Sequence, residues 1–408
     1  MSEQSKKFDL AALATIPLIM TLANSMLIPI LPLIQKQLKI SEVQSSLIIT
    51  VYAAISIVFI PIAGFISDRF GRKKVILIGL TIAAIGGGIS GAGAWLLTEK
   101  TAYWVILIGR FIQGIGAAGA FPVVIPLVGD MYKNDADVSK GLGIIETSNT
   151  FGKVLSPILG SLLANIIWFM PIVVIPFIAI VSIIAVARFV KEKQKKSKKK
   201  NKESLKQFIH SLKEELSSNK WLYTIFIIGG AAMFILFGFL YYLSSTIEDK
   251  HGIDGIWKGF LLAIPLLAVC ISSFAAGKLV GKEQKKMKLF VVIGLVATAA
   301  AMIICGWSKD LSLLMLILLT FIAGAGIGFS LPCLDAIITE NIEKEKRGSI
   351  TSLYSSMRLL GVAVGPLVAS SLIKQTSVQF YLYGGLAVAC LIITLFFMKI
   401  KQQAIAET

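Results

Sequence analysis

Charged residues are scarce in this chain. They make up 15% of its 408 residues, whereas a soluble domain of ordinary composition uses about a quarter. Acidic residues are the scarcer sign, with 23 against 40 lysines and arginines. Hydrophobic residues account for 56% of the chain, and the mean hydropathy is +0.80. This composition excludes an ordinary soluble enzyme and indicates a membrane protein.

Histidine and cysteine are also rare. Both histidines fall in predicted loops, so a histidine relay inside the membrane is excluded. The four cysteines lie inside apolar runs without metal-ligand spacing, and we expect free buried thiols. The chain has no G-x-x-x-x-G-K-[ST] loop for a nucleotide phosphate. We therefore expect no metal, no cofactor and no enzyme activity, and transport would draw its energy from an ion gradient. The cysteines are Cys270, Cys305, Cys333 and Cys390.

Long apolar runs recur along the whole chain. Each is near 20 residues, which is enough to cross a hydrocarbon core of about 30 Å as a helix. The pattern predicts an all-α membrane protein with twelve transmembrane helices. They are expected near 11–33, 45–67, 75–97, 103–128, 141–163, 167–189, 221–244, 259–280, 289–307, 312–336, 350–373 and 380–398.

Most lysines and arginines fall in alternate loops, on the same side as both termini. This bias predicts cytoplasmic termini in a cell membrane. The net charge of +17 is then mainly an orientation signal, and we expect no nucleic-acid partner. We expect a monomer that contacts membrane lipids, a small-molecule substrate and protons.

A basic loop at 191–220 divides the chain into an N-terminal bundle at 1–190 and a C-terminal bundle at 221–408. The loop begins with the lysine-rich run KEKQKKSKKKNK, which is typical of a solvated linker. Its second part spaces Leu205, Phe208, Leu212 and Leu216 as on one face of a helix, which predicts an amphipathic helix on the inner membrane surface. A linker role and a lipid-sensing role both remain open.

The segment Gly64–Lys74 is a charged turn between two apolar runs, and we call it the hinge segment. It reads G-x-x-x-D-R-x-G-R-K, with Gly64, Asp68, Arg69, Gly71 and Arg72 at the fixed positions. This pattern closely resembles the signature loop between helices 2 and 3 of the major facilitator superfamily.

The resemblance covers essentially the whole chain and implies two pseudo-symmetric bundles of six helices. The chain looks most like the twelve-span drug:proton antiporters of Gram-positive bacteria, and within them like siderophore exporters of the bacillibactin type. For the hinge segment, the resemblance implies a cytoplasmic gate in which Asp68 and Arg72 meet Asp130 at the end of a neighbouring span. A gate of this kind would hold the inner face shut while the outer face is open.

Traces of an internal repeat support the two bundles. Gly116 and Pro122 precede Asp130, and Gly326 and Pro332 precede Glu340 at the same spacing, 210 residues later. Duplicated halves place the substrate site between them, near the midplane of the membrane.

The fifth predicted span carries Gly152, Ser156, Pro157 and Gly160. These residues resemble the G-x-x-x-G-P-x-x-G-G pattern of proton-driven exporters, with Ser156 and Ser161 in place of two glycines. The resemblance implies an antiporter helix. Close helix packing through small residues is the alternative.

Charges inside the spans are the strongest functional pointers, because each costs about 2.5–3.5 kcal/mol to insert at the bilayer centre. Arg110 begins an R-x-x-Q-G-x-G sequence that resembles a superfamily motif linked to proton transfer. Glu146 and Lys153 lie seven residues apart on one helix face, and Glu146 is the predicted proton carrier. Asp335 and Arg358 form a structural pair or belong to the site. The polar residues predicted to line the substrate cavity are Asn24, Gln113, Asn149, Asp335 and Arg358.

Together these features predict a proton-coupled exporter of small organic molecules that works by alternating access. Drugs or other amphiphiles are the first substrate class, with a siderophore or another native metabolite as the alternative. A lipid flippase is a further alternative, which would require a laterally open amphipathic cavity. A nutrient importer is disfavoured by the pattern in the fifth span.

Overall fold

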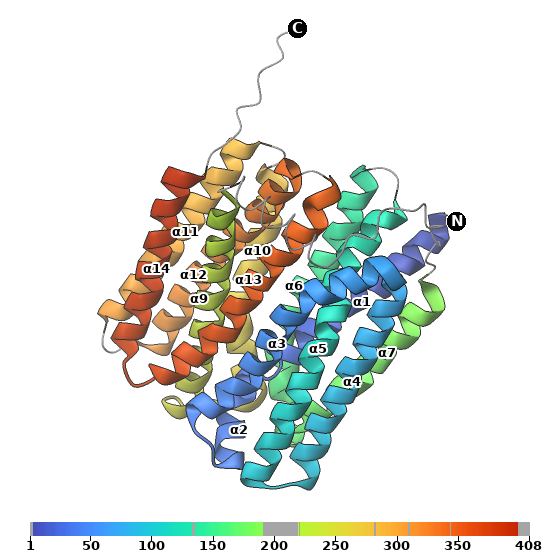
Figure 1. Cartoon of the computed structure of the whole chain (residues 1–408). Coiled ribbons are helices and arrows are strands. Elements are labelled where there is room, and N and C mark those ends of the chain that lie inside the picture. The colour runs from blue at the N-terminus through green and yellow to red at the C-terminus, as the bar shows by residue number, and fades with distance from the viewer. Residues whose placement is uncertain are drawn as a thin grey trace.

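The computed structural model describes residues 3–132, 135–190, 219, 221–280, 283–308, 311–342 and 344–398, and every regular element in these ranges is a helix. Figure 1 shows the helices as two groups that lie side by side. The prediction of an all-α architecture is confirmed. Most of the basic loop, including the predicted amphipathic helix at 205–216, lies outside the described residues.

The first group covers the chain up to residue 190. Its helices are α1 (Glu3–Ser25), η1 (Ile28–Ile30), α2 (Leu31–Leu38), α3 (Glu42–Phe70), α4 (Arg72–Leu96), α5 (Glu99–Met131), α6 (Asp135–Ile166) and α7 (Met170–Phe189).

The second group begins at residue 221. Its helices are α9 (Trp221–Asp249), α10 (Gly255–Val280), α11 (Gln284–Trp307), α12 (Leu313–Asn341), α13 (Lys344–Ser371) and α14 (Thr376–Phe397). The most extensive contacts between the two groups are those of α3 with α13 and of α6 with α10.

Eleven stretches of the described helices are long and apolar enough to cross a membrane. The predicted span at 141–163 corresponds to α6, which is 32 residues long but carries Glu146 and Lys153 and is not among the eleven. Large apolar side chains such as Val58, Phe177 and Phe274 are more than half exposed on the outer faces of their helices. A surface of this kind suits lipid as its surroundings, so the chain is a multi-pass membrane protein.

Helical structure continues beyond the first predicted span. The apolar stretch runs from Lys7 to Leu38, whereas the sequence predicted 11–33. The path breaks between α1 and α2, where Pro29 lies in the short 3₁₀ helix η1. Because proline has no N–H to donate, it ends the ladder of α1. The segment that follows Pro29 folds as the short helix α2, with Leu31, Ile34 and Leu38 buried.

Glycines allow close packing of α4 against α5. A Cβ placed on Gly116 would collide with the backbone of Gly79 and Ala83 on α4. The backbones of the two helices therefore meet directly, as small residues permit in membrane proteins.

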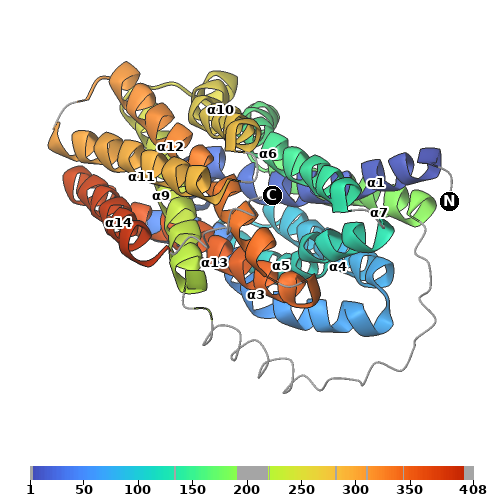
Figure 2. The same cartoon turned by 90° about the horizontal axis from the view of Figure 1, so that it is seen from above.

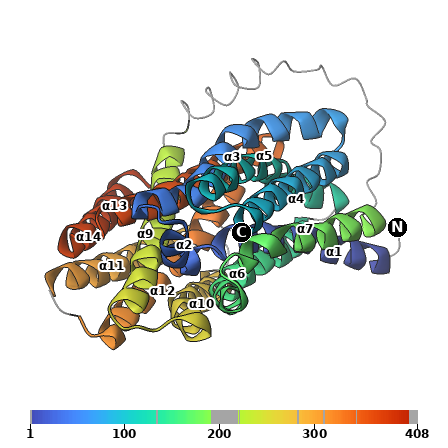
Figure 3. The same ribbon diagram turned by 90° about the horizontal axis from the view of Figure 1, so that it is seen from below.

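The two ends of the helices differ in how the groups meet. We call the end that carries the hinge segment the hinge end, and the end that carries α2 the far end. Figure 1 places the start of α1 and α2 at opposite ends, and Figure 3, seen from below, shows α2 beside α9. The view from above in Figure 2 shows the hinge end.

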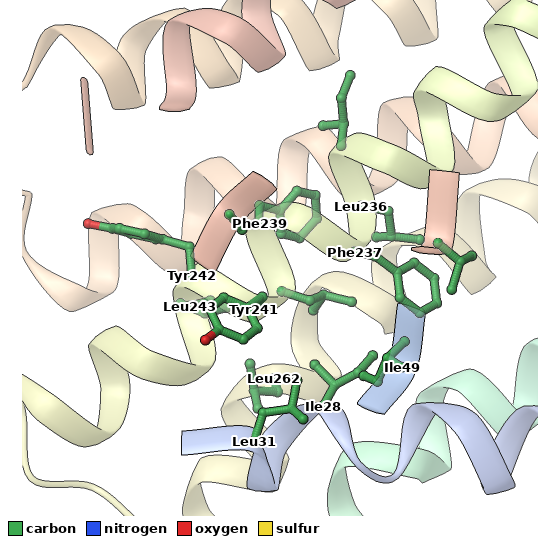
Figure 4. Packing of buried hydrophobic residues seen from close by; sticks show 14 of the residues in the cluster. Ile28, Leu31, Ile49, Leu236, Phe237, Phe239, Tyr241, Tyr242, Leu243 and Leu262 are labelled. Atoms are coloured by element: carbon green, nitrogen blue, oxygen red, sulfur yellow. The ribbon is translucent and has the colours of Figure 1, made fainter. Parts of the chain in front are cut away.

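At the far end, one hydrophobic core spans both groups. It joins Leu31 and Ile49 of the first group to Phe237, Leu240 and Leu262 of the second, and Figure 4 shows several of these side chains packed together. Toward the hinge end, the buried apolar residues form two cores. One belongs to the first group except for Ala363, and the other belongs wholly to the second group. The molecule is therefore closed at its far end.

Candidate functional site

Four charged residues from both groups face one another in the middle of the molecule. They are Glu146 and Lys153 on α6, Asp335 on α12 and Arg358 on α13, and we call them the central charge group. Asp335 Oδ2 lies 3.6 Å from Arg358 Nη1. Lys153 interacts electrostatically with the other three charges, and Glu146 also acts on Asp335 and Arg358. The fold thus brings together all four charges that the sequence singled out in α6, α12 and α13.

Glu146 is held by an amide on its own helix. Asn149 Nδ2 lies 3.2 and 3.3 Å from the two carboxylate oxygens of Glu146, and Thr21 of α1 donates to Asn149 Oδ1 at 2.5 Å. Asn149 itself is buried. The carboxylate is therefore positioned by a short network between α1 and α6.

Lys153 lines a pocket between the two groups, which we call the interface pocket. The pocket is narrow in this conformation, with a cavity volume of about 10 Å³. Its walls come from α1, η1 and α6 on one side and from α9 and α10 on the other. The lining residues are Ser25, Ile28, Pro29, Lys153, Pro157, Phe237, Leu240, Leu262 and Leu266.

Arg110 is fully buried within the first group. Its guanidinium donates to the carbonyl oxygens of Ile48 at 2.8 Å and Ala23 at 3.2 Å, to Gln113 Oε1 at 2.6 Å and to Asn24 Oδ1 at 2.5 Å. It also lies over the Tyr52 ring, 4.3 Å from the centroid.

These contacts join α1, α3 and α5 around one cation. Among the described residues, no carboxylate pairs with Arg110, and Asn24 and Gln113 bind it and do not line the interface pocket. The structure thus separates Arg110, Asn24 and Gln113 from the central charge group. The predicted roles of Arg110 in proton transfer and of the two amides in the cavity stay predictions.

The charges of the hinge segment also come together. Arg72 Nη2 lies 3.2 Å from Asp68 Oδ1, and Arg72 Nη1 lies 2.7 Å from Asp130 Oδ2. Arg72 also donates to the carbonyl of Pro126. Pro126 lines a small pocket together with Thr351 and Ser355 of α13. These ion pairs join α3, α4 and α5.

The other residues of the hinge segment shape the turn. Gly71 has a φ of +98°, a conformation that favours glycine. Arg69 lies over the Phe65 ring at 5.1 Å, and a Cβ on Gly64 would meet open space. The role of this segment as a gate stays a prediction.

Replacing Asp68 with asparagine should slow turnover up to about fivefold with little change in cargo affinity, because an exposed ion pair contributes about 0.2–1 kcal/mol. Initial rates over a range of cargo concentrations measure both quantities. Ser355→Cys should become more accessible from the hinge end. Asp254→Asn, in an exposed loop, is the matched control. A collapse of affinity with unchanged accessibility would place Asp68 in the binding site instead.

A second ion cluster closes the far end, and the sequence did not predict it. Glu248 of α9 accepts from Lys36 of α2 at 2.7 Å and from Lys258 of α10 at 2.8 Å, and Lys36 also pairs with Asp249 at 3.1 Å. The side chains of Lys258 and Glu248 are 3% and 13% exposed. Lys36 belongs to the first group and the acids to the second, so these pairs link the two groups.

Polar contacts between α3 and α13 also link the two groups. Thr50 of α3 donates to the carbonyl of Ala363 on α13 at 2.7 Å, and Ser46 Oγ lies 3.1 Å from Ser370 Oγ.

The sequence offered one signal for the far-end ion cluster. Lys36 and Lys258 each lie next to a predicted span, on the side of the membrane with few basic residues. The partners of Lys36 could not be read from the sequence, because Glu248 and Asp249 lie more than 200 residues away along the chain.

Replacing Glu248 with glutamine should open the far end. Lys258 would remain buried without its closest carboxylate, and breaking a buried pair in this way costs about 3–5 kcal/mol. The open form should therefore gain about 10²- to 10³-fold in relative population. In a variant without the four native cysteines, labelling of Ser370→Cys by an impermeant maleimide measures the opening. Glu283→Gln, in an exposed pair with Lys286, should leave labelling unchanged. Unchanged labelling in Glu248→Gln would contradict a latch.

The residues of the predicted antiporter helix lie at two contacts of α6. A Cβ on Gly152 would meet Leu18 and Thr21, and one on Gly160 would collide with the backbone of Met26, so both glycines pack against α1. Ser156 is buried and donates to the carbonyl of Gly152 at 2.6 Å. Pro157 lines the interface pocket. The glycines thus serve close packing here, and their role in antiport stays a prediction.

A family model described as Major Facilitator Superfamily matches residues 13–308 and 287–407. The bacillibactin exporter of Bacillus subtilis is 47% identical over 397 residues, which cover 97% of each chain. The class B tetracycline resistance protein of Escherichia coli is 26% identical over 86% of each chain. Multidrug resistance protein 2 of Bacillus subtilis is 24% identical over 89% of this chain and 88% of its own.

Two solved structures share the fold. The human organic anion transporter MFSD10 has a TM-score of 0.71 and 18% identity, over 97% of this chain and 100% of its own. The D-xylose-proton symporter has a TM-score of 0.75 and 15% identity, over 96% of this chain and 97% of its own.

Proposed function

This chain belongs to the major facilitator superfamily and is a secondary transporter, and we propose that it exports a small organic molecule in exchange for protons by alternating access. One observation carries this proposal. Charges of both signs from α6, α12 and α13 meet at the boundary between the two helix groups. A site built from both groups is remodelled whenever the groups rock against each other.

The orientation follows from the basic residues. Arg69, Arg72, Lys73 and Lys74 all lie at the hinge end, so we assign this end to the cytoplasm. The far end is then extracellular, and the ion cluster at Lys36, Glu248 and Lys258 closes the transporter to the outside. An exporter takes up cargo from the cytoplasm in conformations that are closed to the outside.

Glu146 is the proposed proton carrier. Its carboxylate interacts with the charges on α12 and α13. Protonation of Glu146 would therefore change the electrostatic interaction between the two helix groups. One proton moving down 100 mV releases about 2.3 kcal/mol. That energy sustains a cargo gradient of about 50-fold.

The relative with 47% identity makes a siderophore of the bacillibactin type the first cargo to test. Drug export is the second candidate, because relatives named for tetracycline and multidrug resistance match most of the chain. The comparisons thus reverse the order that the sequence suggested. No described contact favours the flippase alternative.

Inside-out membrane vesicles test the proposal. A proton gradient, acidic inside, should drive cargo uptake into the vesicles, and an uncoupler should abolish it. Uptake only into right-side-out vesicles would indicate an importer. Growth of a deletion strain under iron limitation and on a panel of toxic compounds would then separate the two cargo candidates. A changed lipid composition of its envelope would favour the flippase.

A further inference from the structure

The interface pocket has one charged residue in an otherwise mostly apolar wall. Phe237, Leu240, Leu262 and Leu266 of the second group face it, and Lys153 is its only charged lining residue. Ser25 is the other polar side chain. These walls are packed together while the far end is closed, so a ligand enters between them when the two groups move apart. It must then present a largely apolar body together with a group that suits an ammonium.

Lys153 is not paired with a carboxylate in this structure. Among the described residues, none places a carboxylate oxygen within 4.0 Å of Lys153 Nζ. Glu146 lies two helical turns away on α6, about 10 Å along the axis, and is engaged with Asn149. Asp335 is engaged with Arg358. Both carboxylates have other partners, so the ammonium of Lys153 remains available to a ligand.

We propose that the interface pocket binds amphiphilic anions, with Lys153 receiving the acidic group and the side chains of α9 and α10 receiving the apolar body. This inference rests on the proposed export function and names its substrate class. A cation that is only partly solvated gains most from an anion that forms a charge-assisted hydrogen bond to it. A cationic ligand in the same place would be repelled by Lys153.

Two dyes that share a dansyl body test the charge preference. Dansylglycine carries a carboxylate, and dansylcadaverine carries an ammonium. Fluorescence titration of the purified protein in detergent should show that dansylglycine binds about tenfold more tightly, since a hydrogen bond to a charged group contributes about 1.5–3 kcal/mol. Lys153→Gln should lose this preference, and Lys153→Arg should keep it. Lys374→Gln, which removes an exposed lysine in a far-end turn, should behave as the wild type.

Equal binding of both dyes by the wild type would overturn the inference. A preference for dansylglycine that survives in Lys153→Gln would also overturn it. So would an equal loss of binding affinity for both dyes in that variant. If Lys153→Gln does not fold, the wild type and Lys153→Arg still decide the question. Failure of the export proposal would be seen separately, as a lack of gradient-driven uptake into vesicles whatever the dyes show.

Discussion

Replacing Glu146 with glutamine should abolish proton-driven uphill export while cargo still binds. Glutamine has nearly the same shape and retains an acceptor for Asn149 Nδ2, but it cannot take up or release a proton. Accumulation in inside-out vesicles should fall from about 50-fold per proton at 100 mV to the external concentration. Downhill exchange of labelled for unlabelled cargo should persist.

The control for this variant is Glu283→Gln, which makes the same change at an exposed position. It should accumulate cargo as the wild type does. Asp335→Asn is the informative companion, because Asp335 is the other acid of the central charge group. Full uphill transport by Glu146→Gln would exclude Glu146 as the proton carrier, and a loss confined to Asp335→Asn would assign that role to Asp335.

Replacing Arg110 with alanine should eliminate transport and destabilise the protein. The change removes the hydrogen bonds that join α1, α3 and α5, and it leaves Asn24 and Gln113 buried without this partner. Several buried polar groups would lose a charged partner, which costs on the order of 3 kcal/mol or more. The protein should still insert, because the span becomes more apolar.

Transport assays and the melting temperature of the solubilised protein measure the two effects. Arg110→Lys should retain part of the activity, since an ammonium keeps the charge but offers three donors in place of five. Arg188→Ala, an exposed arginine at the end of α7, should change stability by less than about 0.5 kcal/mol. Normal transport by Arg110→Ala would reduce the residue to a packing role.

The sequence predicted which of the charged residues lie inside the membrane spans. Glu146, Lys153, Asp335 and Arg358 stand out because a charge in an apolar run is costly wherever its helix is packed. The structure then separated Arg110 from this set. Its motif resembles one linked to proton transfer, yet its side chain is enclosed by Asn24, Gln113 and Tyr52. Which neighbours a buried charge has depends on the rotation of its helix, and the motif does not give that rotation.

The far-end ion cluster shows the same limit. Lys36, Glu248 and Lys258 lie on three helices from both groups. Each lies at the end of an apolar run, and nothing local distinguishes them from charges that simply face water. Only the closure of the far end makes them partners.

By itself, the sequence determined the fold class, the approximate positions of the spans and the hinge turn. These depend on local quantities, namely the transfer free energy of apolar side chains and the desolvation cost of charges. Tertiary structure alone decided which end is closed, how the central charges face one another and that Lys153 lines a pocket without a paired carboxylate. The physical reason is that lipid and protein interior are almost equally apolar, so hydrophobic periodicity does not fix which face of a helix meets its neighbours.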